Sequence, residues 1–147
     1  MLIRLATIDD AMQLCRLNVQ FNGKGETTLD NIRRSLVNNP QEIIAVAEEN
    51  SILVGFICVQ MKKSFCYDAF MPEITELFVE KEYRRGKVAS RLITFIETHC
   101  NQNYPFQRIE LLTGKRNLVA QAFYKSIGYH DDGELHLSKL HEDMKCQ

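Results

Sequence analysis

The chain has 147 residues, which is the usual size of one domain, so we expect a single hydrophobic core and one domain over residues 1–147. A hydrophobic fraction of 45% and a charged fraction of 25% are ordinary for a globular protein and exclude a disordered chain. The formal net charge of -1 favours neither nucleic acid nor an anionic membrane, so any attraction for a polyanion must come from a local cluster of cations.

Residues 2–5 predict a short strand. Thr7 is a candidate N-cap, and the two aspartates after it suit the first turn of an amphipathic helix that ends near Asn22. A second short helix is expected from Thr27, and it must stop before Pro40 because the residue preceding a proline disfavours helical backbone.

Two apolar stretches, 42–48 and 52–61, predict strands, and the polar turn 49–51 between them predicts an antiparallel hairpin. A polar loop is expected over 62–72. A further strand is expected over 74–79.

The remaining pattern predicts a helix from residue 88 to about residue 100, a strand over 107–113 and a helix over 118–127. A last strand is expected to contain Leu135 and Leu137. A strand, helix and strand in succession imply a parallel pair with a right-handed crossover. With the hairpin before it, this predicts an α/β (α+β) domain with a mixed sheet and helices on both faces.

The N-terminus lacks the long apolar region of a secretion signal, and the longest apolar run, 52–59, is too short to span a bilayer. The five cysteines are scattered without a Cys-x-x-Cys pair, which is typical of reduced thiols. The four histidines show no metal-ligand spacing with an acid or a thiol. We therefore expect a cytoplasmic protein with no membrane partner and no metal.

A cluster of cations lies between the strand 74–79 and the helix that follows it. We call this segment the basic turn, and it consists of Arg84, Arg85, Gly86, Lys87, Val88, Ala89 and Ser90. Backbone N–H groups at a helix N-terminus and the helix dipole bind phosphate, and the cations add to this attraction. A glycine permits close approach of the backbone. An ordinary solvated turn has the same composition, so residue types alone leave both interpretations open.

Known nucleotide-binding patterns fit this turn poorly. A P-loop requires Gly-x-x-x-x-Gly-Lys-Ser/Thr, whereas Val88 follows Lys87 here and only one glycine is present. A dinucleotide fingerprint also fails for lack of glycines. The local pattern therefore indicates a pyrophosphate without saying which molecule carries it.

Two segments in a fixed order carry a family resemblance. A strand ending in Leu77-Phe78-Val79 leads into the basic turn, where Arg84 and Ala89 fit the ends of a Gln/Arg-x-x-Gly-x-Gly/Ala motif. Lys87 stands where that motif usually has glycine, and Gly86 falls one place earlier.

The second segment is Asn117-x-x-Ala120-x-x-Phe123-Tyr124-x-x-x-Gly128-Tyr129, further along the chain. Alone it is typical of an amphipathic helix ended by a C-cap glycine. Together the two segments resemble the GCN5-related N-acetyltransferase (GNAT) family. The opening Ile3-Arg4-x-Ala6-x-x-Asp9 is similar to that family's usual start, so the resemblance spans essentially the whole chain.

This resemblance implies a GNAT-type mixed, largely antiparallel sheet with a splayed central parallel strand pair, 74–79 and 108–113. The pantetheine arm of acetyl-CoA would lie in the gap, and a backbone N–H near Phe78 or Val79 would stabilise the oxyanion. The implied cofactor-binding residues are Leu77, Phe78, Val79, Arg84, Arg85, Gly86, Lys87, Val88, Ala89, Ser90, Asn117, Ala120 and Phe123.

Acetyl transfer to an amine needs a base for the amine and an acid for the departing thiolate. Tyr124 occupies the position of the family's usual acid; the alternative is an ordinary core tyrosine. Glu76 is our candidate base because it lies two residues before Phe78 on the same face of the strand. Glu73 and Glu110 are rivals, and a water chain could serve any of them. The resemblance implies that Asn117 binds the pantetheine or the nearby backbone. The alternative is that its side chain caps a helix.

We expect an acetyl-CoA-dependent N-acetyltransferase that acts on the primary amine of a small molecule, aminoglycoside-, polyamine- or amino-acid-like, by direct attack in a ternary complex. The alternatives are an acetyltransferase for a protein N-terminus or lysine, a non-catalytic acyl-CoA sensor, and a nucleotide-binding protein that uses the basic turn. A homodimer would be unsurprising because two-fold assemblies are common. The sequence does not identify the acceptor.

Overall fold

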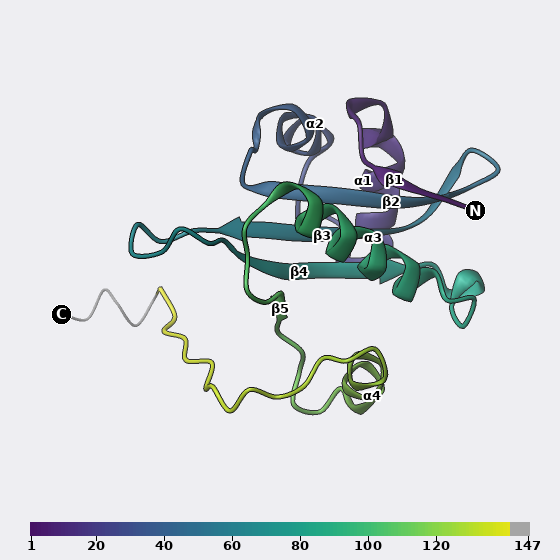
Figure 1. Cartoon of the computed structure of the whole chain (residues 1–147). Coiled ribbons are helices and arrows are strands. Elements are labelled where there is room, and N and C mark those ends of the chain that lie inside the picture. Colours follow the sequence, from purple (N-terminus) through teal and green to yellow (C-terminus); the bar gives the residue numbers. More distant parts are fainter. Residues whose placement is uncertain (142–147) are drawn as a thin grey trace. The chain divides into compact units, whose positions relative to one another are not determined.

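The computed structural model describes residues 1–141, and the chain forms two compact units, Met1–Leu112 and a second one that begins at Thr113. The first unit contains a five-stranded sheet in which each strand lies beside the next one in the chain (Figure 1). Its strands are β1 (Leu2–Leu5), β2 (Glu42–Glu49), β3 (Ile52–Lys62), β4 (Met71–Val79) and β5 (Glu110–Leu111). Only β4 and β5 pair in parallel, so the predicted mixed, largely antiparallel sheet is confirmed.

Helices cover both faces of this sheet, as expected. In the first unit they are α1 (Ala11–Asn22), α2 (Leu29–Asn38) and α3 (Val88–Asn103), with single turns of 3-10 helix at η1 (Ile8–Asp10) and η2 (Lys81–Tyr83). Figure 1 shows α3 across one face of the sheet, and α1 and α2 toward the other. The second unit contains α4 (Leu118–Ser126). None of the helices in residues 1–141 is long and apolar enough to cross a membrane.

Two apolar layers form where the helices meet the sheet. On one face Leu14 and Leu17 of α1 pack with Val46, Phe56 and Phe78 of the strands. On the other face α3 contributes a stripe of buried residues at helical spacing, which are Val88, Leu92, Ile93, Ile96 and Cys100. Burial of apolar surface on both faces explains why β2 and β3 are almost continuously apolar rather than alternating.

An ion-pair network fixes the start of α1. The backbone N–H of Thr7 donates to Oδ2 of Asp10 over 2.7 Å, so that carboxylate caps the turn. Arg4 donates to both oxygens of Asp10 and also to Glu48 of β2. The hydrogen bond from Arg4 holds the pKa of Asp10 below its usual value. At α2 the N-cap is Thr28 rather than the predicted Thr27, because the Thr28 side chain accepts from the N–H of Asn31.

A β-bulge interrupts β4. Cys58 pairs with Glu76 and Val59 pairs with Ile74, so Thr75 has no opposite residue on β3. Ile74 and Glu76 therefore lie on opposite faces of the sheet although they are two residues apart. Pairing between β4 and β5 stops at Ile74 and Leu111, directly before this bulge. Bulges commonly end pairing and turn side chains in a new direction.

One predicted strand is shorter than expected, and another does not form within residues 1–141. The strand expected over 107–113 is reduced to Glu110–Leu111, since β4 offers its neighbour no pairing beyond the bulge. No strand forms around Leu135 and Leu137 within residues 130–141. There Asp131 accepts from the N–H of Gly133 and Asp132 accepts from that of Glu134. Such local side-chain bonds compete with strand pairing and favour turns.

Candidate active site

The basic turn adopts a strained backbone between η2 and α3. Arg85 has a φ of 68° and Lys87 a φ of 60°, both in the left-handed region that favours glycine. Gly86 lies between them but is not in that region. What Gly86 supplies is space, because a Cβ there would approach the carbonyl oxygen of Tyr83 to 3.3 Å. The close approach expected at this glycine is therefore present, whereas a left-handed conformation is not.

The N-terminus of α3 presents backbone donors without a side-chain cap. Lys87 is the N-cap residue, and its side chain makes no capping hydrogen bond. Val88 is buried against the core, while Ala89 and Ser90 are half-buried at the first turn of the helix. Arg85 and Lys87 are exposed beside these donors. Free N–H groups, a helix dipole and two nearby cations make an arrangement suited to an anion.

Arg84 behaves differently from its two basic neighbours. Its Nε donates to the backbone carbonyl of Val79 over 2.9 Å, and its guanidinium carbon lies 5.9 Å from the centroid of the Phe78 ring. The side chain is thus folded back onto the end of β4. Arg84 is exposed, as Arg85 and Lys87 are, but this contact holds its side chain against the strand end.

The end of β4 offers backbone groups on its side away from β3. The N–H of Glu80 donates to the carbonyl of Val54 over 2.9 Å, so that N–H faces β3. Because successive N–H groups of a strand alternate in direction, the N–H of Val79 faces the other side, as does that of Leu77. Within residues 1–141 no strand pairs with this side of β4 after Ile74. Of the two residues considered for an oxyanion donor, Val79 is the one whose N–H faces away from β3.

Gly55 is a residue of this site that our sequence analysis missed. It lies on β3 opposite Val79, and a Cβ there would meet the carbonyl oxygen of Phe78 at 2.7 Å. That separation is shorter than any ordinary contact, and the obstacle is backbone rather than a movable side chain. An isolated glycine inside an apolar strand pattern is the signal that could have revealed this close approach.

Lys62 forms ion pairs with two of the three candidate bases, Glu73 and Glu110. Its Nζ lies 2.9 Å from the carboxylate of Glu73 and forms a short bond to Glu110. These two glutamates are also opposite each other in the parallel pair. One ammonium group therefore engages both of these carboxylates.

Glu76 has no such cation among the described residues. Burial and, to a lesser degree, the carboxylate of Glu42 raise its pKa above the usual value of a glutamate. Its cross-strand neighbour Cys58 is a thiol whose pKa is raised strongly by burial, with added contributions from Glu42 and Glu76. A carboxylate with a raised pKa suits a general base.

The C-terminal half of α1 is fixed to the end of β4. Phe21 lies 5.3 Å from Phe78 between ring centroids, and 6.1 Å from Phe56. Arg16 forms a short ion pair with Glu80, to which Gln20 also donates over 3.0 Å. Helix α1 therefore forms a wall beside the strand end that carries Phe78 and Val79.

The remaining predicted site residues lie in the second unit: Ala120, Phe123 and Tyr124 belong to α4, and Asn117 is its N-cap. Oδ1 of Asn117 accepts from the N–H of Ala120 over 3.1 Å, so the side chain caps the helix, which was the alternative role considered for it. The ring of Tyr124 lies 5.2 Å from that of Phe123 and 6.0 Å from that of Tyr129. Burial raises the pKa of Tyr124, so its phenol keeps its proton at neutral pH.

Comparison with known proteins agrees with this fold and with the motifs. The Acetyltransferase (GNAT) family profile matches residues 9–129, which include the basic turn and α4. The chain therefore belongs to the GNAT acetyltransferase family. No curated protein matches the sequence significantly.

Several solved structures share the fold at low sequence identity. An aminoglycoside acetyltransferase from an uncultured soil metagenomic sample, in complex with trehalose, superposes with a TM-score of 0.83 and 18% identity over 95% of each chain. A ribosomal-protein-alanine N-acetyltransferase from Brucella melitensis gives 0.79 and 14% identity over 94% of this chain and 97% of that one. A transcriptional regulator from Bacillus halodurans gives 0.79 and 17% identity, covering 95% and 99%.

Proposed function

We propose that this protein is an acetyl-CoA-dependent N-acetyltransferase whose acceptor is the primary amine of a small molecule. The observation that carries the proposal is the family match over residues 9–129, because it spans both the basic turn and the Asn117–Tyr129 segment. For the same reason we propose that the two compact units belong to one acetyltransferase domain.

The residues of the first unit suit acetyl-CoA in two respects. The uncapped start of α3, with Arg85 and Lys87 beside it, suits the pyrophosphate. The side of β4 without a neighbouring strand suits the peptide-like pantetheine arm, which can pair with it as an added strand would. Acetyl-CoA supplies the acetyl thioester that the amine attacks.

We assign three roles in the reaction to residues of this chain. The backbone N–H of Val79 stabilises negative charge that develops on the acetyl oxygen. Glu76 takes the proton of the attacking amine, directly or through water, because it lacks the cation that Glu73 and Glu110 share. Tyr124 gives a proton, or a hydrogen bond, to the departing sulfur.

Small-molecule acceptors are favoured by the neighbour in complex with sisomicin, which is described as an aminoglycoside acetyltransferase. A protein N-terminus or lysine is the competing acceptor, since another neighbour is described as a ribosomal-protein-alanine N-acetyltransferase. A cytoplasmic location and a homodimer stay predictions.

The test is a panel of amines with acetyl-CoA and the purified protein, in which acetylated product is followed by mass spectrometry. We expect product with at least one small amine, such as an aminoglycoside, spermidine or an amino acid. Product only with peptides would move the acceptor to proteins. Binding of acetyl-CoA without transfer to any amine would favour a sensor, a role suggested by the neighbour described as a transcriptional regulator. Thermal stabilisation by ATP but not by acetyl-CoA would overturn the proposal.

Tyr124→Phe tests the acid. The substitution removes the phenolic proton but keeps the ring that packs on Phe123 and Tyr129, so the helix is preserved. We expect kcat to fall by about 100-fold or more, as for loss of a general acid, with little change in the Kd of acetyl-CoA. Unchanged steady-state kinetics would remove Tyr124 from this role.

A further inference from the structure

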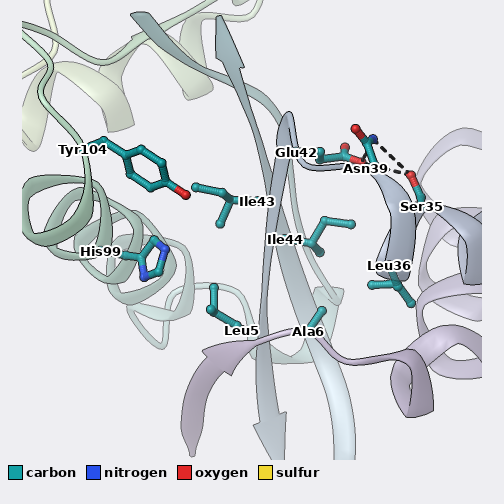
Figure 2. Close-up of a pocket in the computed structure, with 10 residues that line it drawn as sticks. All are labelled: Leu5, Ala6, Ser35, Leu36, Asn39, Glu42, Ile43, Ile44, His99 and Tyr104. Carbon is teal, nitrogen blue, oxygen red and sulfur yellow. Dashed lines mark hydrogen bonds between the residues drawn. The ribbon is translucent and has the colours of Figure 1, made fainter. Parts of the chain in front are cut away.

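A hollow with a volume of about 210 Å³ lies at the edge of the sheet where β1 stops (Figure 2). The pairing of β1 with β2 ends at Leu5 and Ala45, and one more bond joins the N–H of Ala6 to the carbonyl of Ile44. Strand β2 continues beyond this point to Glu42, and within residues 1–141 no strand covers that part of its edge. This edge is separated from the β4–β5 pair by β3.

Apolar and polar side chains line the hollow in about equal measure. Figure 2 shows Ile43, His99 and Tyr104 on one side of β2, and Leu36 and Ile44 on the other. Helices α2 and α3 thus each contribute a wall, and the open strand edge lies between them. Such a concave site, in which apolar side chains are combined with converging polar groups, can hold a small molecule.

The charged group of the hollow is the carboxylate of Glu42, and it is held in place by neutral donors. Ser35 Oγ and Asn39 Nδ2 donate to the same oxygen, Oε2, over 3.2 and 3.1 Å. Asn39 Nδ2 also lies 3.3 Å from Ser35 Oγ, which ties the two donors together. Oε1 accepts no hydrogen bond and Glu42 pairs with no cation among residues 1–141. The carboxylate is thus oriented without being neutralised, unlike Glu73 and Glu110, which share Lys62.

We propose that this hollow is a second ligand site, which binds a small organic amine with a compact apolar body. The ammonium group donates to Oε1 of Glu42, and the body packs between Leu36 and Ile44 on one side and the rings of His99 and Tyr104 on the other. A volume below the roughly 300–1,000 Å³ of drug-sized pockets limits the ligand to a small molecule. The site needs no acetyl-CoA and is independent of the proposed acetyl transfer.

Other classes of ligand fit the hollow less well. An anion would meet the charge of Glu42, and no lysine or arginine lines the hollow to offset it. A metal ion would find a single carboxylate, that of Glu42, which falls short of the set of oxygen ligands that such ions require. A neutral molecule would lack the charge-assisted hydrogen bond that an ammonium group forms.

The proposal is tested by NMR titration of the ¹⁵N-labelled full-length protein with three matched probes in the absence of acetyl-CoA. Cyclohexylmethylamine is the cationic probe, cyclohexylmethanol its neutral counterpart and cyclohexanecarboxylate its anionic one. We expect saturable shifts of the backbone amides of Leu36, Ile43 and Ile44, with the amine bound at least about tenfold more tightly than the alcohol. The carboxylate should not bind.

Variants assign the binding to Glu42. Glu42→Gln should remove the preference for the amine over the alcohol, whereas Glu26→Gln, which removes the same charge from an exposed loop, should leave it unchanged. Ser35→Leu retains Glu42 but places a larger side chain in the hollow, so it should abolish binding of both probes in a protein whose spectrum remains folded. It also keeps the test decisive if Glu42→Gln fails to fold.

Three results would overturn the proposal: equal affinity for amine and alcohol, an unchanged preference in Glu42→Gln, or shifts that lie elsewhere or do not saturate. None of them depends on acetyl transfer. If the protein binds the amine here but transfers no acetyl group, this site is supported and the proposed function is not. If it transfers an acetyl group but does not bind the amine here, the proposed function is supported and this site is not.

Discussion

Glu76 lies on the same face of the sheet as Glu73 and Glu110, but without the lysine that those two share. Its pKa is raised, so the folded protein holds its proton more tightly than the unfolded chain does. Ionised Glu76 therefore lowers the free energy of unfolding at pH values above its folded pKa. Below the pKa of the unfolded glutamate, both states are protonated and this effect disappears.

Glu76→Gln should therefore separate activity from stability. We expect kcat to fall by about 100-fold or more because the proposed base is lost. The thermal midpoint should rise at pH 7 to 8 and converge with that of the wild type below about pH 4. Activity of the wild type should rise with pH through an apparent pKa above that of an ordinary glutamate. Glu73→Gln is the matched control, and a larger loss of kcat there would transfer the role of base to Glu73.

Lys87 takes a left-handed φ of 60° at a position where the family motif has glycine. This conformation costs roughly 1–2 kcal/mol for a residue with a Cβ, although glycine offsets part of the gain by its greater freedom in the unfolded chain. We expect Lys87→Gly to increase the free energy of unfolding by about 1 kcal/mol, as measured by urea denaturation. Lys87→Ala keeps the strain and removes the same charge, so both variants should bind acetyl-CoA more weakly while only Lys87→Gly gains stability. Equal stability of the two would contradict the strain.

Sequence reasoning preferred Glu76 as the base because of strand alternation, but it could not show what distinguishes Glu76 from its rivals Glu73 and Glu110. All three residues are glutamates, so the sequence alone does not distinguish their environments. They differ because Lys62 forms ion pairs with Glu73 and Glu110. The position of Lys62 beside those two depends on the register of β3, β4 and β5. The alternation argument that placed Glu76 beside Phe78 remains valid because the bulge at Thr75 lies before both residues. Alternation would also have placed Ile74 on the same face as Glu76, which the bulge at Thr75 prevents.

Strand β3 lies close to the end of β4, and Gly55 permits this close approach. Because a Cβ at position 55 would lie 2.7 Å from the Phe78 carbonyl oxygen, Gly55→Ala must push the end of β4 away. We expect a loss of about 1–3 kcal/mol in the free energy of unfolding, typical of overpacking. The kcat should also fall, since the N–H of Val79 moves with the strand.

The control for this prediction is Gly114→Ala, where the nearest atom to an added Cβ is the Asn117 side chain at 3.8 Å. Its stability should change little. If Gly55→Ala retained both stability and kcat, the close approach would not matter for the proposed reaction.

The predicted secondary structure is confirmed where a short stretch of sequence determines it. The hairpin of β2 and β3 formed as expected around a turn in which Asn50 and Ser51 both have positive φ. The helix after the basic turn also formed, since its apolar stripe recurs at helical spacing. Strand β5 is shorter than expected because its extent depends on a bulge in β4, which no pattern in residues 107–113 encodes.

Charge is nearly balanced over the whole molecule, with 18 basic and 19 acidic residues, so long-range steering of an anion is weak. Binding of acetyl-CoA should then depend on the exposed cations of the basic turn. We expect Arg85→Glu to weaken acetyl-CoA binding by about tenfold at low salt and by less at high salt, where charges are screened. Calorimetric titration at two salt concentrations measures this.

Lys24→Glu gives the same change of net charge in an exposed loop, and it should leave the affinity for acetyl-CoA unaltered. Equal losses for Lys24→Glu and Arg85→Glu would mean that net charge, rather than the basic turn, attracts the cofactor.

Under the proposed function, the side of β4 that has no neighbouring strand after Ile74 links the stability of this protein to the supply of acetyl-CoA. A molecule that pairs with those backbone groups binds the folded chain and not the unfolded one, so it stabilises the fold by mass action. At a concentration of 100 times its Kd, the gain is about 2.7 kcal/mol, a large part of the stability of a typical domain. Resistance of the protein to proteolysis should therefore follow the acetyl-CoA level of its surroundings.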